Sequence, residues 1–234
     1  MARFVITGTG TDIGKTVFAA GLTGLLGARY WKPVQTGIPV PTMRKPSDVP
    51  APFVQGSCTV HANDPAADPA NAPESDSAFV RRMTGAATLP EAVVLPDPLS
   101  PHRAAELAGV AIPDLPLPDA DPLVIEGAGG VLVPITRELL SAELFARWGL
   151  PVILVATTGL GTISHTLTAL ESLRVRGCRV HGVAFVGDDN PDNIATIGQI
   201  GQVRVLGRLP RLDPLTPESL AAAMRAGFDP QDFA

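Results

Sequence analysis

Cysteine is scarce in this chain of 234 residues, in which only Cys58 and Cys178 occur. The two lie far apart in the sequence, and neither belongs to a C-x-x-C motif. This pattern excludes a disulfide framework and a cysteine-rich zinc site. We expect two unpaired thiols in a reducing compartment.

Charged residues are also few, at 18% of the chain, and the formal net charge is −5. Proteins that bind nucleic acid hold the phosphate backbone with clustered Lys and Arg, and no basic run occurs here. With 45% hydrophobic residues the chain has enough apolar material to fold. We therefore expect a folded protein with no nucleic-acid partner.

Long apolar runs are absent as well. None reaches the roughly 20 residues that a membrane-spanning helix needs. The N-terminus passes from Arg3 through a short apolar segment into a glycine-rich loop, without the apolar stretch of a signal peptide. We expect a soluble, cytoplasmic protein with no membrane partner, built as a single domain over residues 1–234.

Short apolar strands alternate with helical patterns along most of the chain. We expect strands at 4–7, 29–34, 122–125, 151–156, 180–186 and 203–206, and helices at 15–26, 76–83, 101–107, 139–148, 163–176, 190–201 and 217–225. A continuous apolar run such as 151–156 is typical of a parallel strand covered on both faces. The pattern predicts an α/β fold with a doubly wound, mostly parallel sheet and helices on both faces, like that of P-loop NTPases.

Residues from about 38 to 74 break this alternation. Pro, Ala, Asp and Ser dominate there, and neither a helical nor a strand period is visible. A stretch of this length without internal structure is unusual inside a compact domain. We expect a mobile surface insertion at about 38–74.

The first expected strand leads into Gly-Thr-Gly-Thr-Asp-Ile-Gly-Lys-Thr, residues 8–16, at the start of a helix. Glycines let backbone N–H groups turn toward phosphate oxygens, and the helix N-terminus adds partial positive charge. Lys15 can reach the β- and γ-phosphates of ATP, and the Thr16 hydroxyl can bind Mg²⁺. The alternative is a tight strand-to-helix turn that is merely rich in glycine. Five residues, rather than the common four, separate Gly8 from Gly14.

Three further motifs follow expected strands, where ligands bind on sheets of this kind. They are Lys-Pro-Val-Gln-Thr-Gly at 32–37, Glu-Gly-Ala-Gly-Gly at 126–130 and Gly-Leu-Gly-Thr-Ile-Ser-His at 159–165. Lys32 can stabilise charge on a transferring phosphoryl group, although alone it would suggest a solvated lysine. Glu126 resembles a Walker-B metal carboxylate, with a turn-capping residue as the alternative. The third motif opens a helix whose N–H groups could bind a carboxylate.

These four motifs, in this order, resemble those of the dethiobiotin synthetases over nearly the whole chain outside the insertion. The resemblance implies a cyclo-ligase that forms carbon–nitrogen bonds, with Mg²⁺ as cofactor and ATP as co-substrate. It joins 7,8-diaminopelargonate and CO₂ into dethiobiotin through a carbamate and a carbamic–phosphoric anhydride. It also implies a homodimer.

The resemblance further implies the roles of individual residues. Catalysis falls to Lys15 and Lys32, and metal binding to Thr16, Asp76 and Glu126. The implied ATP-binding residues are Asp12, Ile13, Gly14, Lys15, Thr16, Val17, Asp76, Glu126, Gly127, Ala128, Gly129, Gly187, Pro210, Arg211 and Leu212. The implied substrate-binding residues are Thr11, Thr36, Gly161, Thr162, Ile163 and Ser164, the last four acting across the dimer interface.

The sequence departs from the family pattern at three of these positions. Asp12 stands where the family commonly has Glu, and Ser164 stands where Asn is usual. Gly187 occupies the place at which an Asn-Asp pair often reads the adenine base. We expect a shorter reach at Asp12, backbone contacts alone at Ser164, and a less specific base site at Gly187.

The acidic metal ligand between the second and third motifs has two candidates. Ser75-Asp76 opens an expected helix, where Asp76 could also serve only as an N-cap. Ser47-Asp48 competes with it, but no helix follows. We favour Asp76.

Two other functions stay open. A partitioning-type P-loop ATPase switch would carry a signature lysine where this chain has Gly10. A related amide ligase of the cobyrinate type usually has a glutaminase domain, for which we expect no room here.

Overall fold

The computed structural model describes residues 2–38 and 74–234. Its centre is a parallel sheet in the order β2-β5-β1-β6-β7-β8, in which every neighbouring pair is parallel. The strands are β1 (Arg3–Gly8), β2 (Arg29–Trp31), β5 (Leu123–Gly130), β6 (Val152–Thr157), β7 (Val180–Val186) and β8 (Val205–Leu209). The predicted α/β fold class is confirmed.

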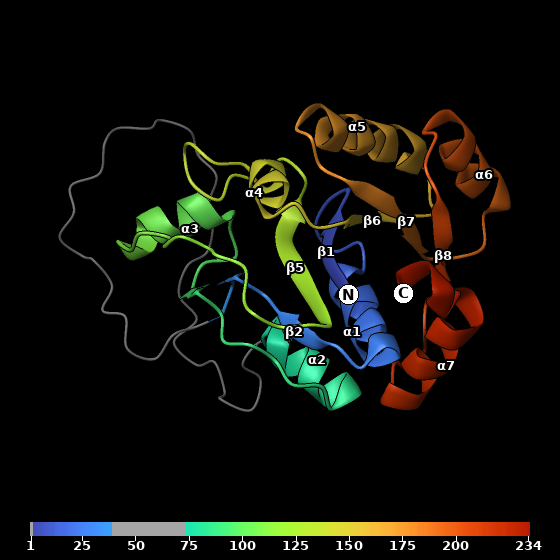
Figure 1. Cartoon of the computed structure of the whole chain (residues 1–234), viewed down its shortest axis with the longest axis horizontal. Helices are drawn as coiled ribbons and strands as arrows, with labels where there is room; N and C mark the ends of the chain where they lie inside the picture. Colours follow the sequence, from blue (N-terminus) through green and yellow to red (C-terminus); the bar gives the residue numbers. More distant parts are fainter. Residues whose placement is uncertain (1, 39–73) are drawn as a thin grey trace.

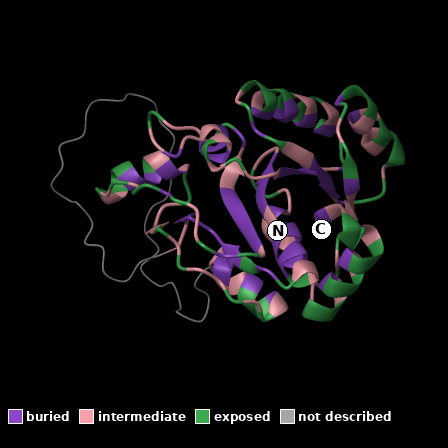
Figure 2. Ribbon diagram, viewed as in Figure 1, coloured by how far each residue is buried: buried purple, intermediate pink, exposed green. Residues whose placement is uncertain are grey.

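Helices cover both faces of this sheet (Figure 1). One face carries α1 (Lys15–Leu26), α2 (Asp76–Thr84), α7 (Pro217–Gly227) and the 3-10 helix η2 (Pro230–Phe233). The other carries α3 (Pro101–Ala108), α4 (Ser141–Trp148), α5 (Thr162–Val175) and α6 (Pro191–Ile200). Alternate side chains of β1 supply both cores, because Phe4 and Ile6 pack toward α1 while Val5 packs toward α4. Figure 2 shows the resulting buried sheet between helices whose outer surfaces are exposed.

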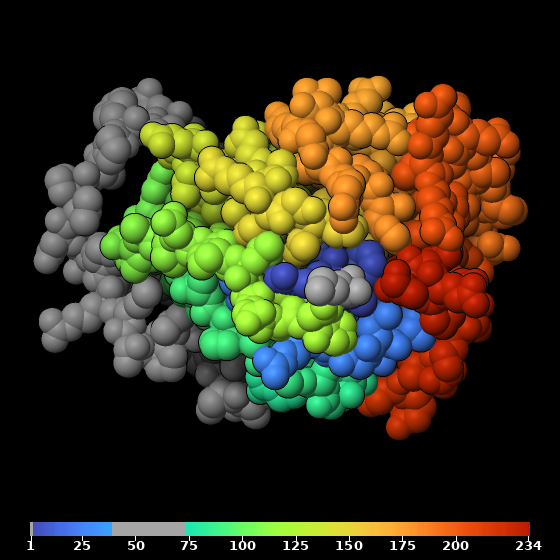
Figure 3. All heavy atoms as spheres, in the orientation of Figure 1, coloured from blue at the N-terminus to red at the C-terminus, as the bar shows by residue number. Residues whose placement is uncertain are grey.

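The two ends of the described chain lie side by side. In Figure 3 the N-terminal segment, in blue, lies beside the C-terminal segment, in red. The rings of Phe4 and Phe233 meet edge to face with centroids 5.9 Å apart. The final residues therefore complete the core on the α1 side of the sheet.

One predicted strand, 29–34, is wrong, because the strand is interrupted in its middle. The expected strand 29–34 is two strands, since β2 ends at Trp31 and β3 (Val34–Thr36) pairs with β4 (Val93–Leu95) in a separate two-stranded sheet. Lys32 and Pro33 occupy the break, and proline has no N–H to donate to a strand ladder. From this break the Lys32 side chain contacts Glu126 of β5 and Asp76 of α2, in the site described below.

The end of β5 also differs from the prediction. The motif Glu126–Gly130 was expected to follow a strand, but it lies within β5, where Glu126 is in register with Ile6 of β1. Gly130 is in register with Gly8, and a Cβ at Gly130 would lie 3.4 Å from the Gly8 carbonyl oxygen. The register shifts between these two pairs, and the small residues allow the strands to pair again beyond the irregularity. The pairing of β5 with β1 and β2 on either side holds Glu126 in a fixed place.

Some expectations fall outside the described residues. The expected insertion at about 38–74 lies outside them except at its two end residues, and so do Asp48 and Cys58. Cys178, in the described part, is buried and free. Within residues 2–38 and 74–234, no helix has the length and apolar character needed to cross a membrane.

Candidate functional site

A cavity of about 830 Å³ opens at the carboxyl ends of β1 and β5 and beside the break between β2 and β3. It is lined by residues from three of the four motifs and from the start of α2. The predicted site residues on its wall are Thr11, Asp12, Gly14, Lys15, Thr16, Val17, Lys32, Thr36, Asp76, Glu126, Ala128 and Gly129. Segments far apart in the sequence therefore meet in one pocket.

The phosphate loop joins β1 to α1 on one side of this pocket. Gly14 precedes α1 with a φ of 90°, and no side chain caps the helix N-terminus. The first N–H groups of an uncapped helix lack intrahelical partners and, with the helix dipole, attract anions. The Lys15 ammonium group lies back over the loop and donates to the Gly10 carbonyl oxygen at 2.6 Å. This geometry suits a phosphate group.

Lys15 is buried at the first turn of α1. Burial lowers its pKa, the nearby charge of Lys32 lowers it further, and Glu126 and Asp76 act in the opposite direction. The net shift is downward, because desolvation disfavours the ammonium form. An anion bound beside Lys15 would therefore gain a poorly solvated cation as its partner.

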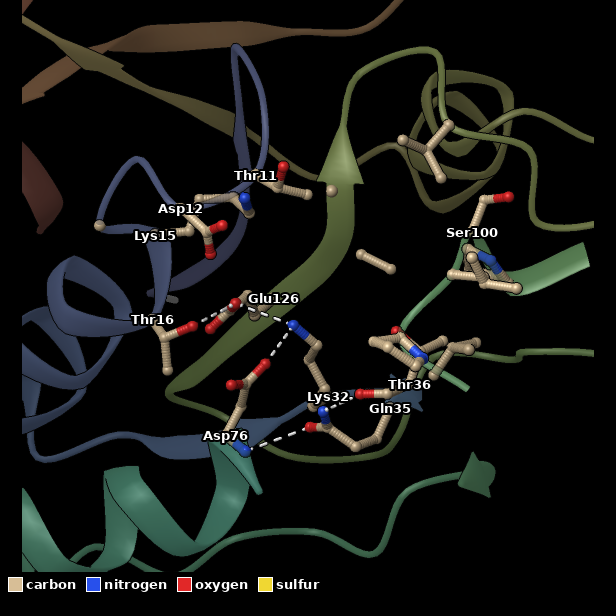
Figure 4. A pocket seen from close by; sticks show the side chains of 18 of the residues that line it. Thr11, Asp12, Lys15, Thr16, Lys32, Gln35, Thr36, Asp76, Ser100 and Glu126 are labelled. Atoms are coloured by element: carbon tan, nitrogen blue, oxygen red, sulfur yellow. Dashed lines mark hydrogen bonds and ion pairs between the residues drawn. The ribbon is translucent and has the colours of Figure 1, made fainter. Parts of the chain in front are cut away.

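Lys32 joins two carboxylates at the centre of the pocket (Figure 4). Its Nζ lies 2.5 Å from Oδ2 of Asp76 and 2.9 Å from Oε1 of Glu126. Burial alone would lower the pKa of Lys32, but the two carboxylates outweigh it and raise the pKa. The side chain is therefore an ammonium ion that neutralises part of the charge of Glu126, which is buried, and of Asp76, which is partly buried.

Asp76 reaches Lys32 because of how α2 begins. Ser75 is the N-cap, and its hydroxyl accepts a hydrogen bond from the Ala78 N–H at 3.2 Å. The Asp76 N–H donates to Oε1 of Gln35 at 3.1 Å. The alternative of Asp76 as the N-cap is thus wrong, and its side chain is free to face the pocket.

Glu126 is almost fully buried, and both of its carboxylate oxygens accept hydrogen bonds. Oε1 accepts from the Thr16 hydroxyl at 2.8 Å and from Lys32, while Oε2 accepts from the Tyr30 hydroxyl at 2.8 Å. Burial, and then the charges of Glu126 and Asp76, raise the pKa of Tyr30 well above its ordinary value. The phenol is therefore a hydrogen-bond donor to Glu126.

Sequence reasoning missed Tyr30 and gave no role to Gln35. Tyr30 is fully buried in β2, and Gln35, also buried, connects Asp76 to the Thr36 carbonyl oxygen, to which its Nε2 donates at 2.9 Å. A tyrosine inside an apolar strand was a usable signal, because a buried phenol usually finds a polar partner. Gln35 carried no comparable signal.

Thr16, Asp76 and Glu126 present a set of oxygen ligands suited to Mg²⁺. Both carboxylates already contact one cationic atom, the Lys32 Nζ, and the Thr16 hydroxyl contacts the same Glu126 oxygen. Mg²⁺ prefers such hard oxygen ligands and completes its shell with substrate phosphates and water. In the part of the chain that the structure describes, no group of three or more His, Cys, Asp or Glu residues could hold a metal. With two carboxylates and one hydroxyl, Thr16, Asp76 and Glu126 fit Mg²⁺ held jointly with phosphate.

Some predicted site residues belong to these segments without lining the pocket. Ile13 packs against the core on the α1 side, and Gly127 faces Phe145, whose Cζ would lie 2.7 Å from a Cβ placed there. Gly187 follows β7 and donates its N–H to the Leu209 carbonyl oxygen of β8. Residues 210–212 come directly after Leu209 in the chain. They therefore lie near Gly187, and they do not line the pocket.

The segment Gly161–Ser164 forms the start of α5 and does not line the pocket of its own chain. The Thr162 hydroxyl donates to the Thr157 carbonyl oxygen at 2.5 Å and is buried. Leu160, just before the helix, is fully exposed. The Thr162 side chain therefore closes the turn after β6, while the neighbouring loop faces outward.

Gly14 offers a test of the phosphate loop. An alanine there would have to keep a φ of 90°, and its Cβ would lie 2.7 Å from Val186 Cγ1. We expect Gly14→Ala to lower the free energy of unfolding by about 2 kcal/mol, from backbone strain and overpacking together. Chemical denaturation measures this change, and adding Val186→Ala should recover only the steric part. A Gly14→Ala protein as stable as wild type would contradict the described loop geometry.

Comparison with known proteins gives a consistent family. A protein-family model described as "AAA domain" matches residues 2–219. The ATP-dependent dethiobiotin synthetase BioD of Novosphingobium aromaticivorans is 48% identical over 239 aligned residues, with 100% of both chains covered. The protein of the same name from Sphingopyxis alaskensis is 46% identical, again over 100% of both chains.

A solved structure of a ParA family ATPase from Chlorobium tepidum is also similar. It covers 95% of this chain and 89% of its own, at 12% identity and a TM-score of 0.47.

Proposed function

The chain belongs to the ATP-dependent dethiobiotin synthetase family, and from that premise we propose how its own residues carry out the reaction. The observation that supports the activity is 48% identity over 100% of both chains to a protein of that name. The reaction joins 7,8-diaminopelargonate, CO₂ and ATP, and it yields dethiobiotin, ADP and phosphate. One amine takes up CO₂ as a carbamate, which attacks the γ-phosphate and displaces ADP. The second amine then attacks the carbonyl carbon of the resulting carbamic–phosphoric anhydride, closes the ring and releases phosphate.

The problem that such a site must solve is the approach of two anions. A carbamate and a triphosphate repel each other, so cations between them lower the barrier. We propose that Lys15 binds the β- and γ-phosphates and that Lys32 stabilises the charge that develops on the transferring phosphoryl group. In Figure 4, Lys32 lies between the phosphate loop, which carries Lys15 and Thr16, and the side of the pocket that carries Thr36 and Ser100.

That second side is the proposed place of diaminopelargonate. Thr36 and Ser100 supply polar groups there, while Val34, Leu99 and Val133 are apolar. An aliphatic chain suits the apolar wall, and hydroxyl or backbone groups suit the amines and the carbamate. We propose that Thr11 and Thr36 hydrogen-bond the reacting amine and that Asp12 orients it.

Mg²⁺ would be held by Thr16, Asp76 and Glu126. When bound, it neutralises charge on the phosphate oxygens and aligns them. The chain itself supplies no covalent nucleophile in this scheme. Positioning and electrostatics carry the catalysis.

The function is tested by ADP release from the purified protein in a coupled assay. We expect release with ATP, Mg²⁺ and bicarbonate to depend on added diaminopelargonate, and mass spectrometry to detect dethiobiotin in equal amount. Strong ADP release that ignores diaminopelargonate would instead favour an ATPase switch. Release that required a different carboxylate and an amine would favour a related amide ligase.

The choice between Asp76 and Asp48 leads to a paired experiment. We expect Asp76→Asn to raise the Mg²⁺ concentration needed for half-maximal activity by about 10-fold or more, since a metal ligand and a partner of Lys32 are both weakened. Asp48→Asn should leave that concentration unchanged. Steady-state kinetics at varied Mg²⁺ measure both. The reverse result would move the metal ligand to Asp48.

We also propose a homodimer in which residues of the segment Gly161–Ser164 bind the substrate carboxylate in the pocket of the second copy. The segment lies at an uncapped helix N-terminus beside exposed Leu160, which is consistent with that role. Light scattering of the purified protein tests the dimer, and a monomer that is fully active would refute it.

Gly187 and the segment 210–212 are the proposed adenine side of the ATP site.

A further inference from the structure

Tyr30 lies outside the four motifs, yet its backbone is held in place on both sides of β2. It is the only tyrosine of the chain, it is fully buried, and it pairs with Val124 in β5. On its other side its N–H donates to the Ala87 carbonyl oxygen, and its own carbonyl oxygen accepts from the Leu89 N–H. Backbone bonds on both edges of β2 therefore fix the position from which the phenol reaches Glu126.

The two oxygens of Glu126 have different partners as a result. Oε1 contacts the groups that line the pocket, the Thr16 hydroxyl and the Lys32 ammonium group. Oε2 accepts a hydrogen bond only from the Tyr30 phenol, at 2.8 Å, among the contacts within the described residues. Rotating this carboxylate to turn both oxygens toward one cation would move Oε2 relative to the phenol and disturb a buried hydrogen bond. An unpaired buried phenol or carboxylate oxygen is costly.

We propose that Tyr30 is a positioning residue that restricts Glu126 to binding the metal through one oxygen and so favours Mg²⁺ over Ca²⁺. This inference rests on the proposed role of Glu126 as a metal ligand. Mg²⁺ takes an octahedral shell of single oxygens, whereas Ca²⁺ takes six to eight oxygens and readily accepts both oxygens of a carboxylate. Groups that hydrogen-bond a metal ligand commonly alter metal affinity by about 10- to 100-fold.

The test compares Tyr30→Phe with a matched control. Thr23→Val also removes one buried hydroxyl, which donates to the Ala19 carbonyl oxygen in α1, and Thr23 does not line the pocket. Bound Mn²⁺ is followed by electron paramagnetic resonance in the presence of a non-hydrolysable ATP analogue. Mg²⁺ and Ca²⁺ are then titrated as competitors, which gives the ratio of their dissociation constants in each protein.

For Tyr30→Phe we expect Mg²⁺ to bind about 10-fold more weakly and Ca²⁺ to bind as well as in wild type or better. The selectivity ratio should therefore fall by about 10-fold. Thr23→Val should keep the wild-type ratio even if its Tm is lower. An unchanged ratio in Tyr30→Phe, or an equal loss for both ions, would overturn the inference.

A second measurement needs no substitution of the site. Because the chain has one tyrosine, growth with 3-fluorotyrosine labels Tyr30 alone. We expect its fluorine NMR signal to shift when Mg²⁺ and the ATP analogue are added, and to shift differently with Ca²⁺. Identical spectra with the two ions would overturn the inference, even if Tyr30→Phe failed to fold.

These outcomes separate the inference from the proposed function. A wild-type protein that binds Mn²⁺ with the analogue but forms no dethiobiotin refutes the reaction, while the selectivity ratio still decides the role of Tyr30. A wild-type protein that binds no Mn²⁺ with the analogue refutes both.

Discussion

The Lys15→Gln protein is expected to release ADP about 100- to 1000-fold more slowly than wild type, the usual loss when one charge-stabilising group is removed from a transition state. Lys15 is buried where α1 begins, and its ammonium group lies over the phosphate loop. Glutamine can fill the space, but it brings no charge to the phosphates. Coupled ADP assays at saturating ATP measure the fall in kcat.

The matched control is Arg179→Gln. It removes one positive charge from an exposed residue just before β7, at the amino end of that strand, whereas the pocket lies at the carboxyl ends of β1 and β5. We expect it to retain wild-type kcat, because an exposed charge at that distance is screened by salt. If Lys15→Gln and Arg179→Gln had similar turnover, Lys15 would have no role in phosphoryl transfer.

Most of the fold could be predicted from local pattern. Helix α1 begins at Lys15 and ends at Leu26 as expected, and the buried strand at 152–157 was visible as an apolar run. The errors occurred where tertiary pairing overrides local signals. Residues 93–95 form β4 by pairing with β3, and β3 begins just after Pro33, where the preceding strand is interrupted.

The candidate site was predictable to the extent that its residues occur in motifs. Lys15 and Lys32 follow strands and Glu126 lies within one, each in a recognisable string, and the topology of the sheet brings them together. What the sequence could not give is the set of contacts among them. That Lys32 binds two carboxylates depends on where α2 begins, and α2 is separated from Lys32 by more than 40 residues in the chain.

The Thr16, Tyr30 and Lys32 contacts to Glu126 show a second limit. A glutamate next to a buried apolar run predicts a polar partner, but three partners come from α1, β2 and the break after β2. Which atoms form these hydrogen bonds depends on the positions of the side chains in the folded protein. Residue types and periodicity do not contain that information.

Lys32→Gln is expected to have two separable effects. Its kcat should fall by about 100- to 1000-fold, because the cation between carbamate and γ-phosphate is lost. Its free energy of unfolding without metal should fall by about 2 kcal/mol, since Asp76 and Glu126 lose their shared partner. This is below the value for a fully buried pair, because the Asp76 side chain is 26% exposed.

A compensating variant separates the two effects of Lys32. Adding Asp76→Asn to Lys32→Gln removes one of the two unpaired carboxylates, so the double variant should regain about half of the lost stability. Its turnover should stay as low as that of Lys32→Gln, because no cation has been restored. Mg²⁺ should raise the Tm of Lys32→Gln more than that of wild type, since the acidic pair then has no internal ammonium partner. If the double variant regained both stability and turnover, Lys32 would act only by balancing charge in the folded protein.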